Sequence, residues 1–204
     1  YARAAHAYDL HRMRFVIAGA EKVTQDTREL WMEQFGLRIF EGYGTTEASP
    51  VVAVNHPRAA RSGTVGRLVA GVEHYIEPVD GIAEGGELVI RGPNVMLGYL
   101  FHGSDGSLVR PAHSRRGDGW YATGDIAAID ADGYVVLKGR SKRFAKIGGE
   151  MVSLNAVEAY AQTVWPDHLH AAVALPDSRK GERIILFTDH AGATSEELQA
   201  WCKA

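Results

Sequence analysis

Three short stretches of this sequence hold the residue types that handle phosphate groups and divalent cations. The first is Glu41–Glu47, in which the glycines let a backbone approach a ligand closely and the threonine hydroxyls can donate to phosphate oxygens. The carboxylate of Glu47 is a hard oxygen donor of the kind that Mg²⁺ prefers. Residue types alone also fit a simpler interpretation, in which this stretch is a polar turn after a strand.

A second stretch, Trp120–Asp125, places an aspartate directly after a glycine. Such an aspartate is usually a turn former, because its side chain bonds to the neighbouring backbone. The same carboxylate could accept hydrogen bonds from two ribose hydroxyls, as acidic residues do in nucleotide-binding proteins. The residues by themselves leave both interpretations of Asp125 open.

The third stretch, Lys138–Lys146, has five cations and no acid in a chain whose net charge is −3. A solvated basic face is the simpler interpretation of such a run. The functional interpretation is that these residues neutralise phosphate, with the forked guanidinium of Arg140 as the strongest donor.

The first sixty residues, which include the stretch at 41–47, have an α/β pattern. The run Met13–Ala18 predicts a buried strand, and Thr24–Phe35 predicts a helix that begins at a capping threonine and ends at Gly36. Leu37–Glu41 predicts a second strand. A strand, a helix and a strand in so few residues indicate a parallel pair with a crossover helix.

Residues 61–141 predict an antiparallel, barrel-like region, because short strand-like runs alternate there with Gly, Pro and Asp. The sequence Asp132-Gly133 between two such runs is a strong hairpin signal. The expected strands are Val72–Glu77, Glu87–Arg91, Ile126–Asp130 and Tyr134–Lys138.

After the basic stretch the pattern is that of a small α+β unit. A hairpin is expected at Gly148-Gly149, followed by a helix over Leu154–Val164 that Ser153 caps. The expected strands of this unit are Phe144–Ile147, Glu150–Ser153, Ala171–Leu175 and Arg183–Thr188. We therefore expect two domains, at 1–141 and 142–204.

Composition excludes several classes of protein. The content of 46% hydrophobic and 23% charged residues is that of a folded globular chain, and the mild acidity gives no electrostatic support for nucleic-acid binding. Cys202 is the single cysteine, so no disulfide framework or multi-cysteine zinc site is expected. No apolar run reaches the roughly 18 residues that a membrane-spanning helix needs. Because both ends lack ordinary boundaries, we expect a fragment of a longer protein.

The order of the motifs resembles that of the adenylate-forming superfamily, which includes acyl-CoA synthetases, luciferases and peptide-synthetase adenylation domains. The matching motifs are Tyr-Gly-x-Thr-Glu at 43–47, Gly-Glu-Leu-x-Ile-x-Gly-Pro at 86–93 with Gly98-Tyr99, Trp-Tyr-x-Thr-Gly-Asp at 120–125 and Gly-Arg-x-Lys-x-x-x-Lys at 139–146. Two further segments, 15–22 and 143–154, look like the acyl-[acyl-carrier-protein] synthetase part of bacterial bifunctional 2-acylglycerophosphoethanolamine acyltransferases. The chain departs from ordinary acyl-CoA synthetases at Leu154, where a proline is usual.

This resemblance implies the C-terminal part of a large AMP-binding domain, followed by a small, mobile and truncated α+β domain. It assigns catalytic roles to Thr46 on phosphate, Glu47 on Mg²⁺ and Lys146 in thiol transfer. It assigns nucleotide contacts to the following residues: Gly19, Ala20, Tyr43 on adenine, Gly44, and Asp125 with Arg140 on the ribose. Lys142 would be the hinge, and Gly149 would lie beside a pantetheine arm.

The implied function is ATP-dependent activation of a fatty acid as acyl-AMP, followed by transfer to the thiol of holo-acyl carrier protein, in a pathway of lysophospholipid reacylation. A fatty acyl-CoA synthetase that uses coenzyme A is the alternative within the family, and a non-catalytic carrier-binding module is the alternative outside it. The superfamily's phosphate loop and terminal lysine are absent here, so we expect residues 1–204 to be inactive alone. The implied location is the cytoplasmic side of the inner membrane, with any membrane attachment through regions outside this chain.

Overall fold

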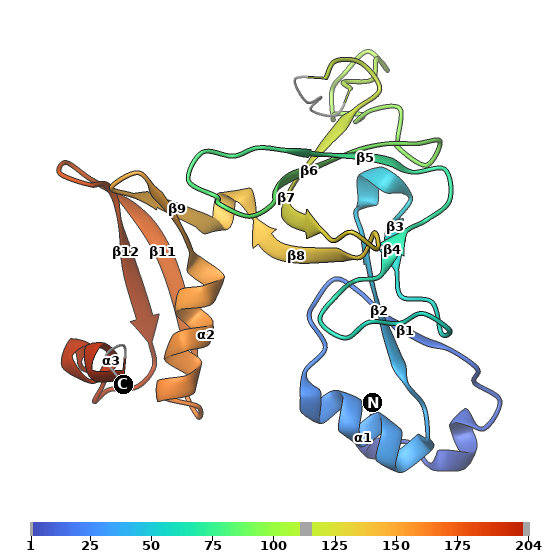
Figure 1. The fold of residues 1–204 in the computed structure, drawn as a ribbon, viewed down its shortest axis with the longest axis horizontal. Coiled ribbons are helices and arrows are strands. Elements are labelled where there is room, and N and C mark those ends of the chain that lie inside the picture. Colours follow the sequence, from blue (N-terminus) through green and yellow to red (C-terminus); the bar gives the residue numbers. More distant parts are fainter. Residues whose placement is uncertain (1, 111–115, 202–204) are drawn as a thin grey trace. The chain divides into compact units, whose positions relative to one another are not determined.

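The computed structural model describes residues 2–110 and 116–201 (Figure 1). The chain forms two compact units. The first comprises Tyr1–Glu77, Leu88–Thr123 and Ala127–Leu137, and the second comprises Pro78–Glu87, Gly124–Ile126 and Lys138–Ala204. The expected domain limits at 1–141 and 142–204 stay a prediction.

The first unit begins with the expected strand, helix and strand, but the expectation that the first strand is buried is wrong, because none of its residues is buried and Ile17 is 64% exposed. Strand β1 (Val16–Ala18) pairs in parallel with β2 (Ile39–Gly44), and helix α1 (Gln25–Phe35) connects them. Thr24 caps the helix by accepting a hydrogen bond from Thr27 N at 3.3 Å, and Gly36 ends it in the left-handed conformation at φ +66°. Two 3-10 helices, Ala2–Ala4 and Ala7–Leu10, precede β1.

Strand β2 is longer at its end than the sequence indicated, because it continues through the glycines at 42 and 44. Strand β3 (Val51–Val54), which the sequence analysis missed, pairs antiparallel with β2, and β4 (Arg67–Leu68) pairs antiparallel with β3. The sheet is therefore mixed, in the order β1-β2-β3-β4. The 3-10 helix η3 (Thr46–Ala48) connects β2 to β3.

A second sheet has the order β5-β6-β7-β8, with strands at Glu73–Glu77, Gly86–Arg91, Tyr121–Ile129 and Val135–Arg140. The hairpin at Asp132-Gly133 is confirmed: Gly133 has φ +82°, and Asp130 accepts hydrogen bonds from Asp132 N and Tyr134 N at 2.9 Å each. The core of the first unit includes the fully buried Val52, Leu88 and Ile90. Burial of each such side chain contributes about 2 kcal/mol.

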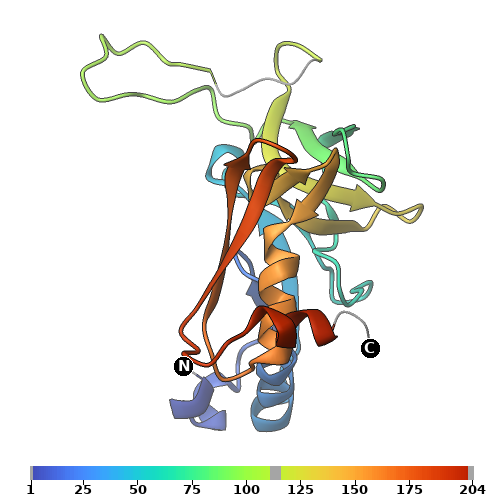
Figure 2. The ribbon, with the colours of Figure 1, turned by 90° about the vertical axis from the view of Figure 1, so that its left-hand side faces the viewer.

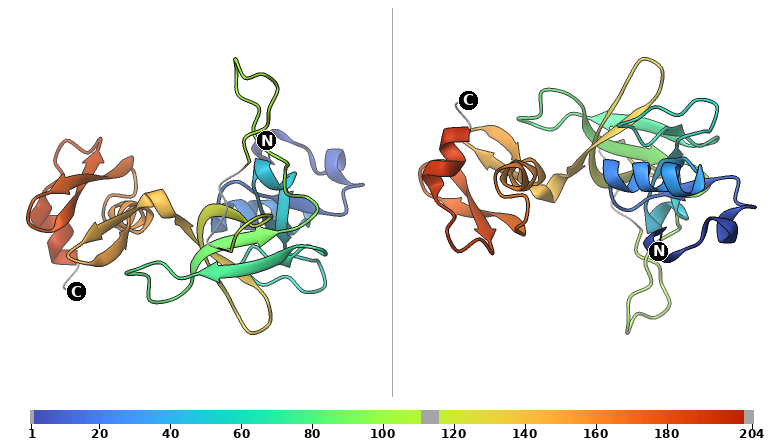
Figure 3. Two further views of the ribbon diagram at one scale, coloured as in Figure 1. Left: turned by 90° about the horizontal axis from the view of Figure 1, so that it is seen from above. Right: turned by 90° about the horizontal axis from the view of Figure 1, so that it is seen from below.

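The connection between β6 and β7 contains a long extended arm, which projects from the body of the first unit in Figure 3. At its base, Tyr99 and Val109 pair as an antiparallel bridge, with N–O distances of 2.7 and 2.9 Å. The two hydrogen bonds of this bridge hold the two sides of the arm together at its base.

The second unit contains a sheet in the order β10-β9-β12-β11, with strands at Phe144–Ile147 (β9), Glu150–Ser153 (β10), His170–Asp177 (β11) and Gly181–Thr188 (β12). Helix α2 (Leu154–Val164) packs along β11 and β12, as Figure 2 shows, and α3 (Ser195–Trp201) follows. Ser153 caps α2 as expected. The 3-10 helix η4 (Ser141–Arg143) precedes β9.

Two expectations from the sequence concern membrane-spanning helices and the single cysteine. Among the described residues, no helix is both long and apolar enough to span a membrane. Cys202 lies outside the described residues.

Candidate nucleotide and phosphate site

The turn after β2 holds two of the expected catalytic residues. A β-bulge between Tyr43 and Gly44 redirects the chain, and Thr45 N then donates to Pro50 O at 2.8 Å. A Cβ on Gly44 would lie 2.1 Å from Pro50 O, so no larger residue fits there. The need for glycine at this position therefore comes from the turn itself. The turn leaves Thr46 exposed.

The Glu47 side chain is held by a residue to which the sequence analysis gave no role. Tyr99 Oη donates to Glu47 Oε1 at 2.7 Å, and Met96 N donates to Glu47 O at 2.8 Å. The hydrogen bond to Glu47, together with partial burial, raises the pKa of the Tyr99 hydroxyl. The sequence signal for this contact was the Gly98-Tyr99 pair, which was used only to support the resemblance.

Tyr43, expected to stack on adenine, is only 8% exposed and packs in the core beside Val52 and Leu88. Its stacking role stays a prediction. Next to it, the buried hydroxyl of Thr45 has no hydrogen-bond partner within the part of the chain that the structure describes.

Gly19 and Ala20 follow β1 directly. A Cβ on Gly19 would lie 3.3 Å from Gly42 O, so the backbone here runs close to β2. Ala20 adopts φ +70°, and Ser49, at the end of η3, adopts φ +58°. Left-handed backbone costs a residue with a Cβ roughly 1 kcal/mol, and such strain concentrates at binding sites. This strain agrees with the expected nucleotide contacts, which stay predictions.

Asp125 and Arg140 are brought together, as the resemblance implied. Arg140 Nε lies 2.9 Å from Asp125 Oδ1, and the side chains are 64% and 8% exposed respectively. Asp125 lies inside strand β7, so its interpretation as a turn former is wrong. Gly124, with φ +73°, donates its N–H to Glu87 Oε1 at 3.0 Å, which distorts the strand next to Asp125.

The five cations of 138–146 divide into two groups, so the interpretation as a uniformly solvated face is wrong. Lys138 pairs with Glu84 at 2.9 Å, and Arg143 pairs with Glu158 at 2.6 Å. Arg140 pairs with Asp125. Lys142 and Lys146 are exposed, and neither side chain has an ion pair among the residues described in this structure.

Lys142 and Lys146, the two cations without an ion pair among the described residues, are those to which the resemblance assigned the hinge and the role in thiol transfer. Lys142 lies in η4, and Lys146 lies in β9 just before the turn at Gly148-Gly149. Both glycines have positive φ, +60° and +98°, and a Cβ on either would meet nothing within 4 Å. The turn therefore offers open backbone beside an available cation, although the roles of Lys142, Lys146 and Gly149 stay predictions.

Comparison with known proteins agrees with this resemblance. Residues 1–100 match the family of AMP-binding enzymes. The long-chain fatty-acid–CoA ligase of Yersinia pestis is 32% identical over 202 residues, which are 96% of this chain and 35% of that relative.

Two solved structures extend the similarity to the fold. Anthranilate CoA ligase AuaEII with anthranoyl-AMP is 27% identical, with a TM-score of 0.62 over 92% of this chain and 36% of the other. The ATP-bound RpMatB-BxBclM chimera B1 is 26% identical, with a TM-score of 0.69 over 97% of this chain and 40% of the other. The expected fold class is thereby confirmed. This chain spans 35–40% of the length of these three proteins, two of which are named as CoA ligases.

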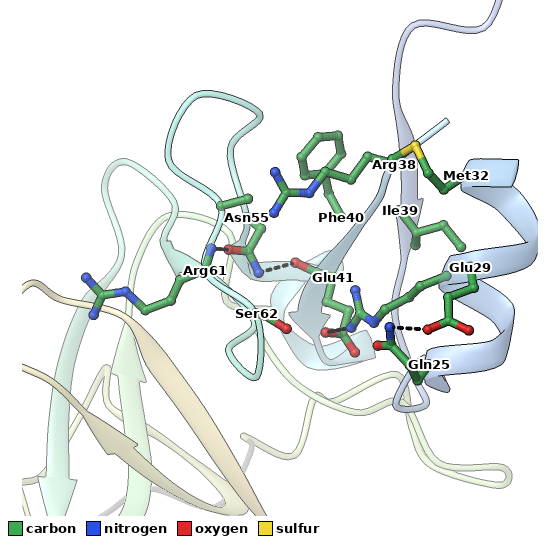
Figure 4. A pocket seen from close by; sticks show the side chains of 12 residues that line it. Gln25, Glu29, Met32, Arg38, Ile39, Phe40, Glu41, Asn55, Arg61 and Ser62 are labelled. Atoms are coloured by element: carbon green, nitrogen blue, oxygen red, sulfur yellow. Dashed lines mark hydrogen bonds and ion pairs between the residues drawn. The ribbon is translucent and has the colours of Figure 1, made fainter. Parts of the chain in front are cut away.

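One cleft in the first unit is lined by none of the expected site residues. Figure 4 shows this cleft of about 320 Å³, formed by α1, the start of β2 and the loop at 55–62. Glu41 is 9% exposed; its carboxylate pairs with Arg28 and accepts from Val23 N at 3.1 Å. Asn55 Nδ2 donates to Glu41 O and to Thr64 O. Because these polar groups are hydrogen-bonded to one another, we interpret the cleft as part of the structural framework of the first unit rather than as a ligand site.

At the expected Mg²⁺ position, the described residues present the single carboxylate of Glu47 rather than a complete cage of ligands. Among the described residues, no group of three or more His, Cys, Asp or Glu side chains could hold a metal ion. Mg²⁺ usually keeps several waters and binds through one or two carboxylates and the phosphates of its substrate. The half-buried Glu47, beside the exposed hydroxyl of Thr46, fits that mode of binding.

Proposed function

We propose that the protein containing this chain is an AMP-forming acid–thiol ligase that activates a fatty acid and transfers it to coenzyme A. The observation that supports this most strongly is the pair of Asp125 and Arg140 at 2.9 Å, in the motif positions that the resemblance assigns to ribose contacts. The match of residues 1–100 to AMP-binding enzymes and the similarity of the chain to a fatty-acid–CoA ligase support the same proposal.

In the first half-reaction, a carboxylate oxygen of the fatty acid attacks the α-phosphorus of ATP. The bond between that phosphorus and the bridging oxygen breaks, and pyrophosphate leaves. Because two anions must meet, positive charge at the site lowers the barrier. Thr46 would donate to phosphate and Glu47 would hold Mg²⁺, which supplies charge neutralisation when bound.

In the second half-reaction, the acceptor sulfur attacks the acyl carbon of acyl-AMP. The carbon–oxygen bond to AMP breaks, AMP leaves, and the thiol proton passes to solvent. Lys146 lies beside the open turn at Gly148-Gly149, so its ammonium group would face the phosphopantetheine arm in this state. Lys142, in η4, would be the hinge between the two states.

The acceptor is the point on which the two candidates within the family differ. Coenzyme A is our proposal, because the relatives found are CoA ligases. Holo-acyl carrier protein, with a role in lysophospholipid reacylation and a location on the cytoplasmic side of the inner membrane, is the second candidate. Its support is the resemblance of segments 15–22 and 143–154.

The decisive experiment is fatty-acid-dependent exchange of radioactive pyrophosphate into ATP by the complete protein, followed by thioester formation with each acceptor. Exchange with fatty acids, and faster thioester formation with coenzyme A than with holo-acyl carrier protein, are expected. Faster transfer to the carrier protein would favour the second candidate. No exchange with any fatty acid would leave the non-catalytic carrier-binding module.

We also propose that residues 1–204 alone catalyse neither half-reaction. The superfamily's glycine-rich phosphate loop and its terminal lysine have no counterpart in this sequence. Pyrophosphate exchange above background by these residues alone would contradict this statement.

A further inference from the structure

The segment that follows β6 forms three hydrogen bonds with the turn after β2, which contains Glu47. Asn94 Nδ2 donates to Ala48 O at 2.8 Å, Met96 N donates to Glu47 O at 2.8 Å, and Tyr99 Oη donates to Glu47 Oε1 at 2.7 Å. The first two bonds fix the main chain of η3. The third reaches the carboxylate that the proposed reaction uses.

We propose that Tyr99 is a positioning residue that fixes the carboxylate of Glu47 for the proposed adenylation reaction. This inference rests on the proposed function, because it concerns the same site. It adds a residue that lies 52 positions after Glu47 and to which the sequence analysis gave no role.

The physical reason is the freedom of a glutamate side chain. An exposed or half-buried glutamate samples several rotamers, and holding it in one geometry before the reaction removes that entropic cost. A hydrogen bond from a phenol to an ionised carboxylate is stronger than a bond between neutral groups. Tyr99 is itself held in place, since its backbone pairs with Val109 in both directions.

A purely structural role for the Tyr99 hydroxyl is the alternative. Tyr99 is 37% exposed, and its ring lies 6.1 Å from the exposed Phe101. Tyr134 provides the matched contrast: its hydroxyl donates to Ala59 O at the same distance of 2.7 Å, but its side chain is only 5% exposed. Removal of the Tyr134 hydroxyl should therefore affect stability at least as much as removal of the Tyr99 hydroxyl.

The test compares Tyr99→Phe with Tyr134→Phe in the complete protein. We expect Tyr99→Phe to lower kcat for acyl-AMP formation by about 10- to 100-fold, with an unchanged KM for the fatty acid. We also expect weaker binding of ATP in the presence of Mg²⁺ by calorimetry, and unchanged binding of ATP in EDTA. Tyr134→Phe should lower Tm by as much or more and leave both binding constants and kcat unchanged.

A double-mutant cycle with Glu47→Gln shows whether Tyr99 acts through Glu47. Tyr99→Phe should have no further effect on Mg²⁺-ATP binding in the Glu47→Gln background. Equal effects in both backgrounds, or wild-type binding and kcat in Tyr99→Phe, would overturn the inference. If the wild type shows no pyrophosphate exchange, the proposed function fails, whereas the calorimetric cycle still decides the role of Tyr99.

Discussion

Arg140 Nε lies 2.9 Å from Asp125 Oδ1, so a side chain at the end of β8 is tied to one inside β7. The Asp125 side chain is largely covered, whereas the Arg140 side chain is 64% exposed. The ion pair therefore orients the Arg140 side chain before a ligand binds. The remaining N–H groups of its guanidinium can then donate hydrogen bonds to the ligand without a further loss of side-chain conformational entropy.

Loss of the guanidinium should weaken the use of ATP. We expect Arg140→Ala to raise the Kd for ATP by about tenfold or more, since a charge-assisted hydrogen bond is worth about 1.5–3 kcal/mol. Arg140→Lys should recover only part of this loss, because an ammonium group lacks the planar fork. Lys138→Ala, which removes the ion pair with Glu84 from the same strand, is the control and should bind ATP normally.

Lys146→Ala should separate the two half-reactions. Because the exposed ammonium lies next to the open turn at Gly148-Gly149, we expect it to act on the thiol acceptor rather than on ATP. Thioester formation from acyl-AMP should fall about tenfold while pyrophosphate exchange stays near the wild-type rate. The exposed Lys180 on the neighbouring hairpin provides the control, as Lys180→Ala should change neither rate. Equal loss of both half-reactions in the Lys146 variant would contradict the assigned role.

The pairing of Arg143 with Glu158 predicts a pH-dependent stability of the second unit. Glu158 Oε1 accepts from Arg143 Nη2 at 2.6 Å and from Ala172 N at 2.7 Å. Burial by itself would raise the pKa of Glu158, but the bonds from Arg143 and Ala172 lower it below its usual value. A carboxyl group whose pKa is lower in the folded state stabilises that state above its unfolded pKa, and loses this contribution as the pH falls through the folded pKa.

Glu158→Gln should therefore destabilise the protein by about 1–2 kcal/mol at pH 7. The difference from the wild type should shrink as the pH falls below the usual glutamate pKa of about 4.3 and through the lower pKa that Glu158 has in the folded state, because the wild-type carboxyl becomes neutral over that range. Urea unfolding at pH 7 and at pH 3.5 checks the prediction. A difference that stays constant between these two values would show that the charge of Glu158 does not contribute.

Gly44→Ala should prevent correct folding of the turn before Thr46. The new Cβ would lie 2.1 Å from Pro50 O and 3.2 Å from Val51 Cα, and these backbone atoms cannot move aside by a side-chain rotation. We expect a loss of about 3 kcal/mol or more in the free energy of unfolding, at the upper end of the usual cost of overpacking. Gly133→Ala is the control for glycine substitution, since a Cβ there meets nothing within 4 Å and only its φ of +82° is unfavourable. This variant should lose about 1 kcal/mol.

Local signals predicted many of the elements. Helix α1 matched its expected span because Thr24 and Gly36 give cap signals that act within one turn, and β9, β10 and α2 matched for the same local reasons. Strand β1 was predicted too long, because the exposed Met13 and Phe15 extend an apolar run without belonging to the sheet. Strand β3 was missed, although its four residues are all Val or Ala and turn-forming residues, Pro50 and Asn55, flank it.

The sequence by itself determined the resemblance to AMP-binding enzymes and the residue types at the candidate site, since motif order and spacing are properties of the chain. Only the tertiary structure decided which of these residues meet. Glu47 and Tyr99 are 52 residues apart, and the division of the basic run into paired and available cations depends on Glu84, Asp125 and Glu158. Such contacts join segments that are distant in sequence. Local preferences do not encode them, because they depend on how strands pair and on which side chains burial leaves within hydrogen-bond reach.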